Sequence, residues 1–453
     1  MECNLKKQLD KVGAVWNRTV AYLEGKNTFV MWCACILYKC LLDLYYLNVM
    51  HPVWYSSGLG CNPDFVRYVL SWVLLVAGYA GMPKEENSNL GFFFQIQWFL
   101  TVMPMLTLYV FDSDQTSSIY MGYVFAVIIV ENILVQRLKN ITPVKLKTKA
   151  DIRQYFTVAL AITAVACVAI IILWNSFEGL RAFDFEYIYK MREKLEFPRG
   201  FGYIEAWVTR IVIPFLYIKC LSEKKYVGAV LALGMQVFLF MILGYKFLIL
   251  EMVVFTGVFI IWKLKIPVKA IAFGLNLLVF IGLVSYKMES YGTHSINLKI
   301  NALLGDRTLF IPALYKFRYY NFFSEHPKVW FSNGLIGKCL GETNLYKYSL
   351  GYTIDGWHRG GTMLADFNTG YLGEAYAQMG FCGMMLMGIL LVIIISFINS
   401  YGRYMPDTIL LGFVGYIAIV MNDGSLLTAC ITGGIWLIIL ICMIYSRKER
   451  DYG

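Results

Sequence analysis

Basic and aromatic residues are concentrated in one stretch, GDRTLFIPALYKFRYYNFFSEHP, which runs from Gly305 to Pro327. Arginine is the residue best suited to phosphate, because its planar guanidinium donates two parallel hydrogen bonds and stays charged when desolvated. Arg307 and Arg318 lie about three helical turns apart, so a continuous helix would place both on one face. Pro312 lies between them and could start a new helix instead, which leaves the shared face open.

Three residues beyond this pair are candidates for a general base. His326 precedes Pro327 in a loop, and a loop histidine can accept a proton near neutral pH. Asp366 and Glu374 are carboxylates near the start of an apolar segment. Arg359 and Asn368 flank Asp366 and could bind the substrate.

The aromatic residues beside Arg318 allow two interpretations. Tyr315, Tyr319, Tyr320, Phe322 and Phe323 could form a flat amphipathic surface for a sugar. They could equally form the aromatic belt that membrane proteins place at the lipid–water interface, and this second interpretation is favoured.

The elements that must position these residues are membrane helices. The chain has 453 residues, of which 58% are hydrophobic and 15% charged, too apolar a composition for an ordinary soluble protein. Apolar runs of about 20 residues, enough to cross the hydrocarbon layer, recur along it. We expect an all-α, polytopic membrane protein with about twelve spans, near 28–50, 64–82, 90–111, 118–136, 155–175, 203–221, 226–244, 247–263, 267–288, 370–399, 406–423 and 426–445.

The distribution of Lys and Arg predicts the orientation of these spans. The connection after the fourth span is the richest in basic residues, whereas 51–63, 112–117 and 422–425 contain no Lys or Arg. Both termini are therefore expected in the cytoplasm. The net charge of +10 is explained by this topology, so no nucleic-acid partner is expected.

Four parts of the chain follow from this topology. Residues 1–27 are predicted to be a cytoplasmic amphipathic arm that lies on the membrane. Residues 28–288 would form nine membrane helices with an extracytoplasmic loop at 176–202. Residues 289–369 would be a large extracytoplasmic loop, folded against the membrane domain, between the ninth and tenth helices. Residues 370–453 would add three helices and a short cytoplasmic tail.

Several ionisable residues lie inside the predicted spans, where each one costs at least about 2.5 kcal/mol on insertion scales. Lys39 and Asp43 are four residues apart on one helix face and should neutralise each other. The others fall mainly in the outer halves of their helices and suggest a polar cavity open to the outer leaflet. These outer residues are Arg67, Arg210, Lys246, Glu251, Lys287 and Glu374.

Cysteine and acidic residues indicate no metal site or disulfide framework. Most cysteines fall within predicted spans, and a bond between Cys61 and Cys339, which do not, is not expected. Asp112 and Asp114 form an Asp-x-Asp motif of the kind that holds a divalent cation in some glycosyltransferases, but a solvated turn is the favoured interpretation. No metal and no cofactor are expected.

The last third of the chain resembles the O-antigen polymerase (Wzy) group, which shares its plan with the O-antigen ligases. The resemblance rests on an arginine in a long outer loop, a turn with His326, Pro327 and nearby glycines, and the motif NTGYLGEAYAQMGFCG entering an apolar helix. Ligases usually carry a histidine before the Asn of this motif, where this chain has Phe367, which favours polymerase. The family's small-residue–Arg turn is matched by GYKFLIL, with Lys246 in place of arginine.

The resemblance implies a polymerase of oligosaccharide repeat units carried on undecaprenyl diphosphate, for O-antigen, capsule or exopolysaccharide. It would work at the outer face of the bacterial cytoplasmic membrane, in company with a flippase and a chain-length regulator. Cations would stabilise the diphosphate leaving group. The expected substrate-binding residues are Arg307, Arg318, Lys246, Arg210, Arg359 and Asn368, and the candidate bases are Asp366, Glu374 and His326.

Other functions remain open. A flippase or transporter of lipid-linked oligosaccharides is the main alternative, because twelve spans suit many carriers. Carriers, however, often show internal repeats and charges near the middle of the membrane. This chain shows no convincing repeat and has its charges in the outer half. A membrane acyltransferase would predict a histidine in the membrane or on the cytoplasmic side, whereas all four histidines map outside.

Overall fold

The computed structural model describes residues 27–54, 58–85, 88–138, 141–142, 150–175, 187–288, 301–341, 343–363, 366, 368–401 and 405–445. The predicted arm 1–27 lies almost wholly outside these residues, as do parts of both predicted loops and the C-terminal tail. Within the described residues all regular structure is helical, apart from one isolated bridge between Asn62 and Asp112. The chain divides into two compact units, each built from two stretches of sequence.

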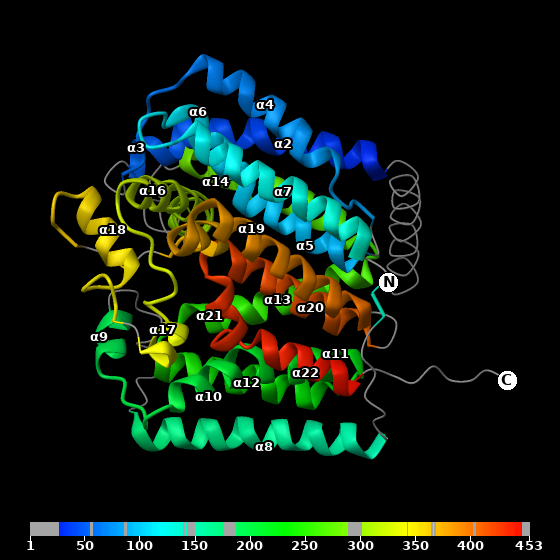
Figure 1. Ribbon diagram of the computed structural model, residues 1–453. Coiled ribbons are helices and arrows are strands. Elements are labelled where there is room, and N and C mark those ends of the chain that lie inside the picture. Colours follow the sequence, from blue (N-terminus) through cyan, green and yellow to red (C-terminus); the bar gives the residue numbers. More distant parts are fainter. Residues whose placement is uncertain are drawn as a thin grey trace. The chain divides into compact units, whose positions relative to one another are not determined.

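Unit 1 comprises Met1–Asn132 and Leu264–Met385. In it α2 packs on α6 and α14, α4 packs on α6, and α16 packs on α6 and α18 (Figure 1). Its elements are α2 (Asn27–Tyr45), η1 (Tyr46–Met50), α3 (His51–Trp54), α4 (Phe65–Ala80), α5 (Asn89–Gln97), η3 (Trp98–Val102), α6 (Met103–Phe111), most of α7 (Ser118–Leu138), α14 (Pro267–Met288), η7 (Ala302–Phe310), α16 (Ile311–Glu325), α17 (Leu335–Leu340), α18 (Leu350–His358) and the first part of α19 (Gly370–Ser400).

Unit 2 comprises Ile133–Lys263 and Leu386–Gly453. Here α11 packs on α12 and α20, and α13 packs on α12 and α20. Its elements are α8 (Ala150–Trp174), α9 (Tyr187–Glu193), α10 (Phe201–Trp207), η5 (Val208–Val212), α11 (Ile213–Ser222), α12 (Tyr226–Leu243), α13 (Lys246–Lys263), the remainder of α19, α20 (Asp407–Asp423), α21 (Leu426–Ile431) and α22 (Ile435–Tyr445).

The twelve predicted spans coincide with helical segments, but 426–445 is interrupted between α21 and α22, and 370–399 is interrupted at Met379 and Gly380. Seven helices among the described residues are long and apolar enough to cross a membrane, and two shorter apolar helices, Phe65–Ala80 and Ile435–Tyr445, accompany them. The seven are Thr28–Trp54, Asn89–Phe111, Ser118–Leu138, Ile152–Trp174, Tyr226–Leu243, Pro267–Tyr286 and Gly370–Ser400. The chain is therefore a helical membrane protein, and the full set of twelve crossings stays a prediction.

The described residues include four π-helical segments. In each case a proline lies two residues after the last residue of the segment. The prolines are Pro52 after η1, Pro104 after η3, Pro214 after η5 and Pro312 after η7. A proline has no N–H to donate, and its ring clashes with the carbonyl one turn earlier. Widening that turn into a π-helix removes the conflict without ending the helix. Pro312 thus marks a change of helix type and lies at the second position of α16.

The predicted span 370–399 is not one continuous helix. Met379 (φ −141°, ψ 21°) and Gly380 (φ 64°, ψ −145°) are non-helical and divide α19 in two. A Cβ on Gly383 would lie 2.3 Å from the carbonyl oxygen of Ala375, eight residues earlier, so the two backbones are in contact there. Residues eight apart in a straight helix are separated by about 12 Å. The chain therefore reverses sharply at Gly380.

The first half of α19 runs in the opposite direction to the one predicted. Tyr371 donates a hydrogen bond to Glu131, 3.0 Å away and well along α7. Tyr376 instead lies 5.9 Å from Tyr120, close to the start of α7. A continuous span starting at the outer surface would place Glu374 deeper in the membrane than Asn368. Instead, the segment from Tyr371 to Tyr376 approaches the start of α7, which is predicted to lie at the outer surface. The sequence did not reveal this, because the apolar run continues through the break.

Candidate functional site

Arg318 is the centre of a buried polar cluster in unit 1. Its side chain is only 1% exposed. Its Nε and Nη2 both donate to Gln115 Oε1, at 3.2 and 3.0 Å, and Nη2 also lies 3.4 Å from the carbonyl oxygen of Gly58. A Cβ at Gly58 would come within 2.2 Å of Nη2, and its φ is +89°, so only glycine fits there.

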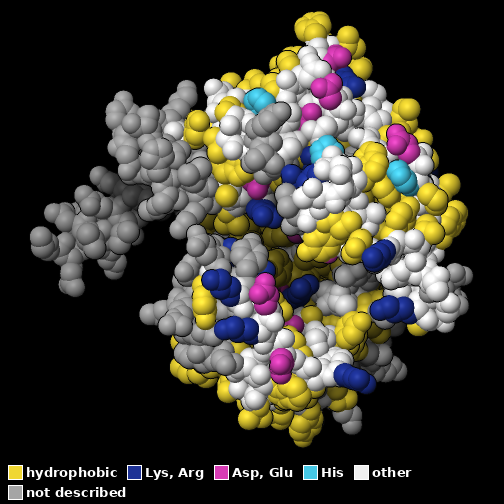
Figure 2. Space-filling model, turned by 90° about the vertical axis from the view of Figure 1, so that its left-hand side faces the viewer, with side chains coloured by type: hydrophobic (Ala, Val, Ile, Leu, Met, Phe, Trp, Pro, Cys, Tyr) yellow, Lys and Arg dark blue, Asp and Glu magenta, His cyan; other side chains and the backbone are white. Residues whose placement is uncertain are grey.

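Arg318 thereby joins three connections that the charge distribution placed on one side of the membrane. Gly58 belongs to the first outer connection and Gln115 to the second. His358, at the end of α18, belongs to the long connection 289–369, which also contains Arg318, and its Nε2 lies 2.9 Å from Arg318 Nη2. Figure 2 looks onto the side of the molecule that carries α18, where histidine and basic side chains interrupt the apolar surface.

The contact with Arg318 fixes the state of His358. A guanidinium can only donate, so Nε2 must accept and the ring proton must sit on Nδ1. Desolvation of the ring, together with the nearby charges of Arg318 and Arg359, lowers the pKa of His358 to about 4. His358 is therefore neutral at physiological pH and is a poor base while Arg318 occupies Nε2.

A buried carboxylate connects the two arginines of this cluster. Asp355 is 0% exposed and accepts hydrogen bonds from Tyr315 Oη, at 2.8 Å, and from Arg359 Nε, at 2.9 Å. The guanidinium carbon of Arg318 lies 4.9 Å from the centre of the Tyr315 ring. The side chain of Arg359 remains 24% exposed, so this arginine can also reach a ligand.

A second carboxylate lies on the other side of Arg318. Asp112 is 1% exposed and accepts hydrogen bonds from Gly60 N and Gln115 Nε2, at 3.0 and 2.9 Å. The interpretation of the Asp-x-Asp motif as a solvated turn is therefore wrong for Asp112. Two guanidinium groups and two carboxylates balance in charge, so Arg318 is chiefly a positioning residue. Arg359 is the arginine of this cluster whose side chain is partly exposed to solvent.

Two of the three candidate bases act electrostatically on one tyrosine of α16. Tyr319, next to Arg318 on α16, is 3% exposed and feels the charges of both Glu374 and Asp366. Gln378 Nε2 donates to Glu374 Oε1 at 3.0 Å, and Ser349 Oγ donates to Asp366 Oδ1 at 2.7 Å. The charge of Arg359 thus acts on Arg318, and the charges of Glu374 and Asp366 act on Tyr319, the next residue of α16.

The third candidate base is held by aromatic rings. The ring of His326 stacks on Phe322, with centroids 4.1 Å apart and an interplanar angle of 3°. Its Nδ1 lies 2.9 Å from the carbonyl oxygen of Phe322 and must donate to it, which leaves Nε2 as the acceptor. Trp357 packs edge-on against the same ring, at 6.0 Å.

The predicted aromatic belt is wrong for most of its members. Tyr315, Tyr319, Phe322 and Phe323 are at most 3% exposed and pack inside unit 1, so they do not face lipid. Hydropathy could not separate the two cases, because buried and lipid-facing aromatic residues have the same composition.

Arg307 does not accompany Arg318. It lies in η7 with a side chain that is 58% exposed, and its Nε is 3.8 Å from Asp306 Oδ2. Asn368 is also exposed. Because one arginine is at the surface and the other is buried, the two do not form the pair that their spacing suggested.

Arg210 and Lys246 belong to unit 2, and Arg210 forms part of a separate polar group. Arg210 lies in η5, with its guanidinium carbon 5.8 Å from the centre of the Phe247 ring, and its charge acts on Glu205 and Glu251. Glu251 is 2% exposed, and neither carboxylate oxygen has a hydrogen-bond partner among the described residues. Lys246 starts α13.

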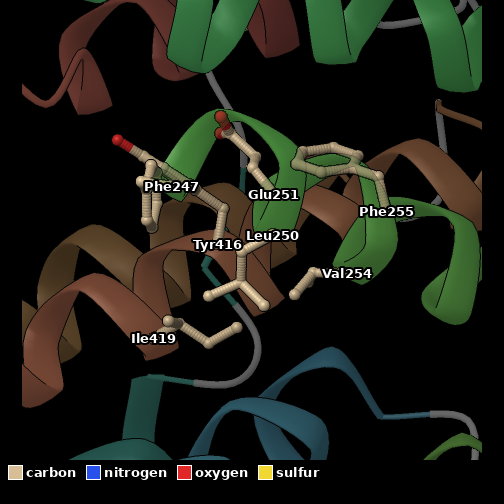
Figure 3. A pocket seen from close by; sticks show the side chains of 7 residues that line it. All are labelled: Phe247, Leu250, Glu251, Val254, Phe255, Tyr416 and Ile419. Atoms are coloured by element: carbon tan, nitrogen blue, oxygen red, sulfur yellow. The ribbon is translucent and has the colours of Figure 1, made fainter. Parts of the chain in front are cut away.

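Glu251 also borders an apolar pocket between α13 and α20. Figure 3 shows that its carboxylate points away from Leu250 and Ile419, so carbon atoms make up the lining. The residues that line the pocket are Phe247, Leu250, Glu251, Val254, Phe255, Tyr416 and Ile419.

An arginine outside the predicted site reaches the turn before α13. Arg192, on α9, donates from Nε and Nη2 to the carbonyl oxygen of Gly244, at 3.2 and 2.9 Å. It also lies 5.3 Å from the centre of the Tyr245 ring. A guanidinium is therefore present at the GYK turn, although Lys246 follows it in the sequence.

His358, Asp355 and Gln115 were not predicted as site residues. Asp355 carried a signal, because it precedes Arg359 by four residues and can pair with it on one helix face. Gln115 had none, since only the fold brings it to Arg318. Among the described residues no group of three or more His, Cys, Asp or Glu side chains could hold a metal ion.

Comparisons with known proteins add no family to this picture. No protein-family model matches the chain, and no curated protein or solved structure shows significant similarity to it. The likeness to O-antigen polymerases therefore rests on the motifs of the sequence alone.

Proposed function

We propose that this protein polymerises lipid-linked oligosaccharide repeat units at the outer face of the bacterial cytoplasmic membrane. It would transfer the growing glycan from undecaprenyl diphosphate onto the next lipid-linked unit. The acceptor hydroxyl attacks the anomeric carbon, and the bond from that carbon to the diphosphate oxygen breaks. The diphosphate leaves with the electron pair, and the hydroxyl proton passes to a carboxylate.

One observation carries the proposal: arginine side chains that can bind an anion and carboxylates that can accept a proton both lie around α16. Arg318 is linked to His358 and lies beside the Arg359–Asp355 pair, while the charges of Glu374 and Asp366 act on Tyr319. A diphosphate leaving group needs cations, and the attacking hydroxyl needs a base. Candidates for both roles lie around one helix whose partner connections are predicted to be outside the cell.

The exposure of the side chains assigns their roles. Arg359 and Arg307 are partly exposed and would contact the diphosphate, while buried Arg318 positions α18. Glu374 is the stronger candidate base, because Gln378 donates a hydrogen bond to its carboxylate and holds it in place. Asp366 and His326 remain alternatives. Asn368 is proposed to bind another part of the substrate, whereas Arg210 and Lys246 belong to unit 2 and are not assigned to this site.

The test is the length of the surface glycan in cells. The gene is deleted and replaced by wild type, Arg359→Ala, Glu374→Gln or Lys338→Ala, at matched protein levels. Lys338 is an exposed lysine on α17 and serves as the control for loss of a surface charge. We expect single repeat units in the deletion strain and in the first two variants, and long polymer in the Lys338→Ala strain.

The leaflet on which intermediates collect separates this function from its main rival. A polymerase that fails leaves single lipid-linked units at the outer leaflet. If the deletion strain instead holds them on the cytoplasmic leaflet, the protein is a flippase. Unchanged glycan length in the deletion strain would remove the polymerase proposal altogether.

A further inference from the structure

The segment after α16 contains two adjacent residues with unfavourable backbone geometry. Trp330 has φ 51° and Phe331 has φ 65°, in the left-handed region that glycine adopts readily and other residues avoid. Such conformations persist only where the surrounding structure enforces them, and they are concentrated at functional sites. Despite the strain, the Trp330 side chain is 64% exposed, so the conformation does not serve to bury it.

Backbone hydrogen bonds to the first half of α19 impose this geometry. Val329 N donates to Ala377 O at 2.9 Å, and Trp330 N donates to Gln378 O at 3.1 Å. Phe331 N donates to the side chain of Gln378, at 2.6 Å from Oε1. Three successive N–H groups are thus bound to α19, which fixes the direction of the Cα–Cβ bond of Trp330.

The same glutamine holds the candidate base. Gln378 Nε2 donates to Glu374 Oε1 at 3.0 Å and to Asn333 Oδ1 at 3.2 Å. The backbone of Trp330 and the carboxylate of Glu374 are therefore both held by Gln378. Tyr376, in the same half-helix, packs near the start of α7, so Trp330 lies toward the predicted outer end of unit 1.

We propose that Trp330 is the platform on which a sugar ring of the acceptor repeat unit stacks, so that its hydroxyl reaches Glu374. An indole offers a large flat surface and has little conformational freedom to lose on binding, which suits the apolar face of a pyranose. The strained backbone keeps this surface directed outward. The proposal rests on the proposed polymerase function and names the residue that orients its acceptor.

The first test observes Trp330 directly, without turnover. The full-length protein is labelled with 5-fluorotryptophan, and the ¹⁹F signal of Trp330 is the one of eleven that Trp330→Phe removes. In nanodiscs it is titrated with oligosaccharide fragments of the strain's own surface polysaccharide, and separately examined with spin-labelled lipids. We expect a saturable shift of this signal with saccharide, while the signal of Trp174, an exposed residue at the end of α8, stays in place.

Either of two results overturns the proposal. If spin-labelled lipid broadens the Trp330 signal and saccharide leaves it unchanged, the residue is a membrane-interface anchor. If neither ligand affects the signal, it is not a binding residue.

A glycine substitution separates binding from folding. Glycine accepts φ 51° without strain, so Trp330→Gly should keep or raise the Tm, because only the exposed indole is lost. We expect saccharide affinity to fall roughly tenfold or more, as for loss of a central aromatic residue in a binding surface. A fall in Tm with unchanged affinity would mean that Trp330 has a structural role.

Failure of the two proposals can be told apart. If the deletion strain keeps normal glycan length but saccharide still shifts the Trp330 signal, the glycan site stands and the polymerase reaction does not. If the deletion abolishes polymer and saccharide has no effect on Trp330, the polymerase stands and the acceptor is held elsewhere.

Discussion

At the scale of single residues, Arg318 illustrates what spacing along the chain can and cannot reveal. Its type and its aromatic neighbours identified it as important, yet its partners Gly58, Gln115 and His358 lie far away in the sequence. A buried guanidinium needs several acceptors, because leaving it unpaired costs several kcal/mol. The fold supplies these acceptors from three connections, and no local sequence pattern predicts which residues they are. By contrast, the pairing of Lys39 with Asp43 was predicted from their four-residue spacing and is confirmed, at 2.7 Å to Oδ2.

His358 gives this cluster a dependence on pH. Its pKa in the folded protein, about 4, lies below the ordinary value of 6.5, so between these values the unfolded chain binds more protons. The stability contributed by neutral His358 is therefore present above about pH 6.5 and is lost as the pH falls toward 4. We expect the Tm of wild type to fall more steeply than that of His358→Gln between pH 7.5 and 5, since glutamine can accept from Arg318 but does not titrate.

The measurement is thermal unfolding of both proteins in the same detergent across this pH range. Carboxylates titrate in both proteins, so only the difference between the two curves reports on His358. His358→Phe, which cannot accept from Arg318, should be less stable at every pH. A constant gap between wild type and His358→Gln would contradict the assignment of a neutral histidine.

At the scale of elements, the sequence predicted where helices occur better than it predicted whether each helix is continuous. Most residues of all twelve expected segments are helical, because long apolar runs leave few other ways to satisfy the backbone in lipid. The π-helical turns were not predicted, although each is associated with a proline that the sequence displays. The reversal in α19 was also missed, because its hydropathy is uninterrupted and Gly380 is one small residue among many.

The reversal can be tested with a pair of alanine substitutions. Gly380 has φ 64° and ψ −145°, a combination that only glycine adopts readily, so Gly380→Ala should destabilise the protein by about 1–3 kcal/mol. Gly122 lies within α7, and a methyl group added there would meet no neighbouring atom within 4 Å, so Gly122→Ala should be neutral or stabilising by up to about 1 kcal/mol. Urea or thermal unfolding in matched micelles compares the two. Equal effects would mean that α19 is straight.

At the scale of the whole molecule, two compact units interleave along the chain, and each carries its own polar group. In unit 1 the three connections that meet at Arg318 are those predicted to lie outside the cell. Because these three connections contact one another, they lie on the same side of the membrane, as the distribution of Lys and Arg predicts. The number of crossings is the part of the prediction that rests on hydropathy alone.

Native thiols offer a direct test of the orientation. Cys61 and Cys339 are exposed free cysteines on predicted outer connections, and Lys265 lies in a turn predicted to be cytoplasmic. A maleimide that cannot cross membranes should label Cys61 and Cys339 in intact spheroplasts. It should label Lys265→Cys only after the membrane is opened. The Cys61→Ser/Cys339→Ser variant provides the background, and labelling of Lys265→Cys from outside would invert the topology.

The turn at Gly380 has a consequence for how position along the chain translates into distance from water. From Tyr371 to Tyr376 the backbone moves toward the start of α7, and after Gly380 it doubles back past Ala375. Along 370–385 the chain therefore approaches the predicted outer end of unit 1 and then turns back from it. Each residue before Gly380 lies at about the same depth in the membrane as a residue after it. A quenching profile measured residue by residue would be nearly a mirror image about Gly380, and Glu374 would share its level with a residue beyond the turn.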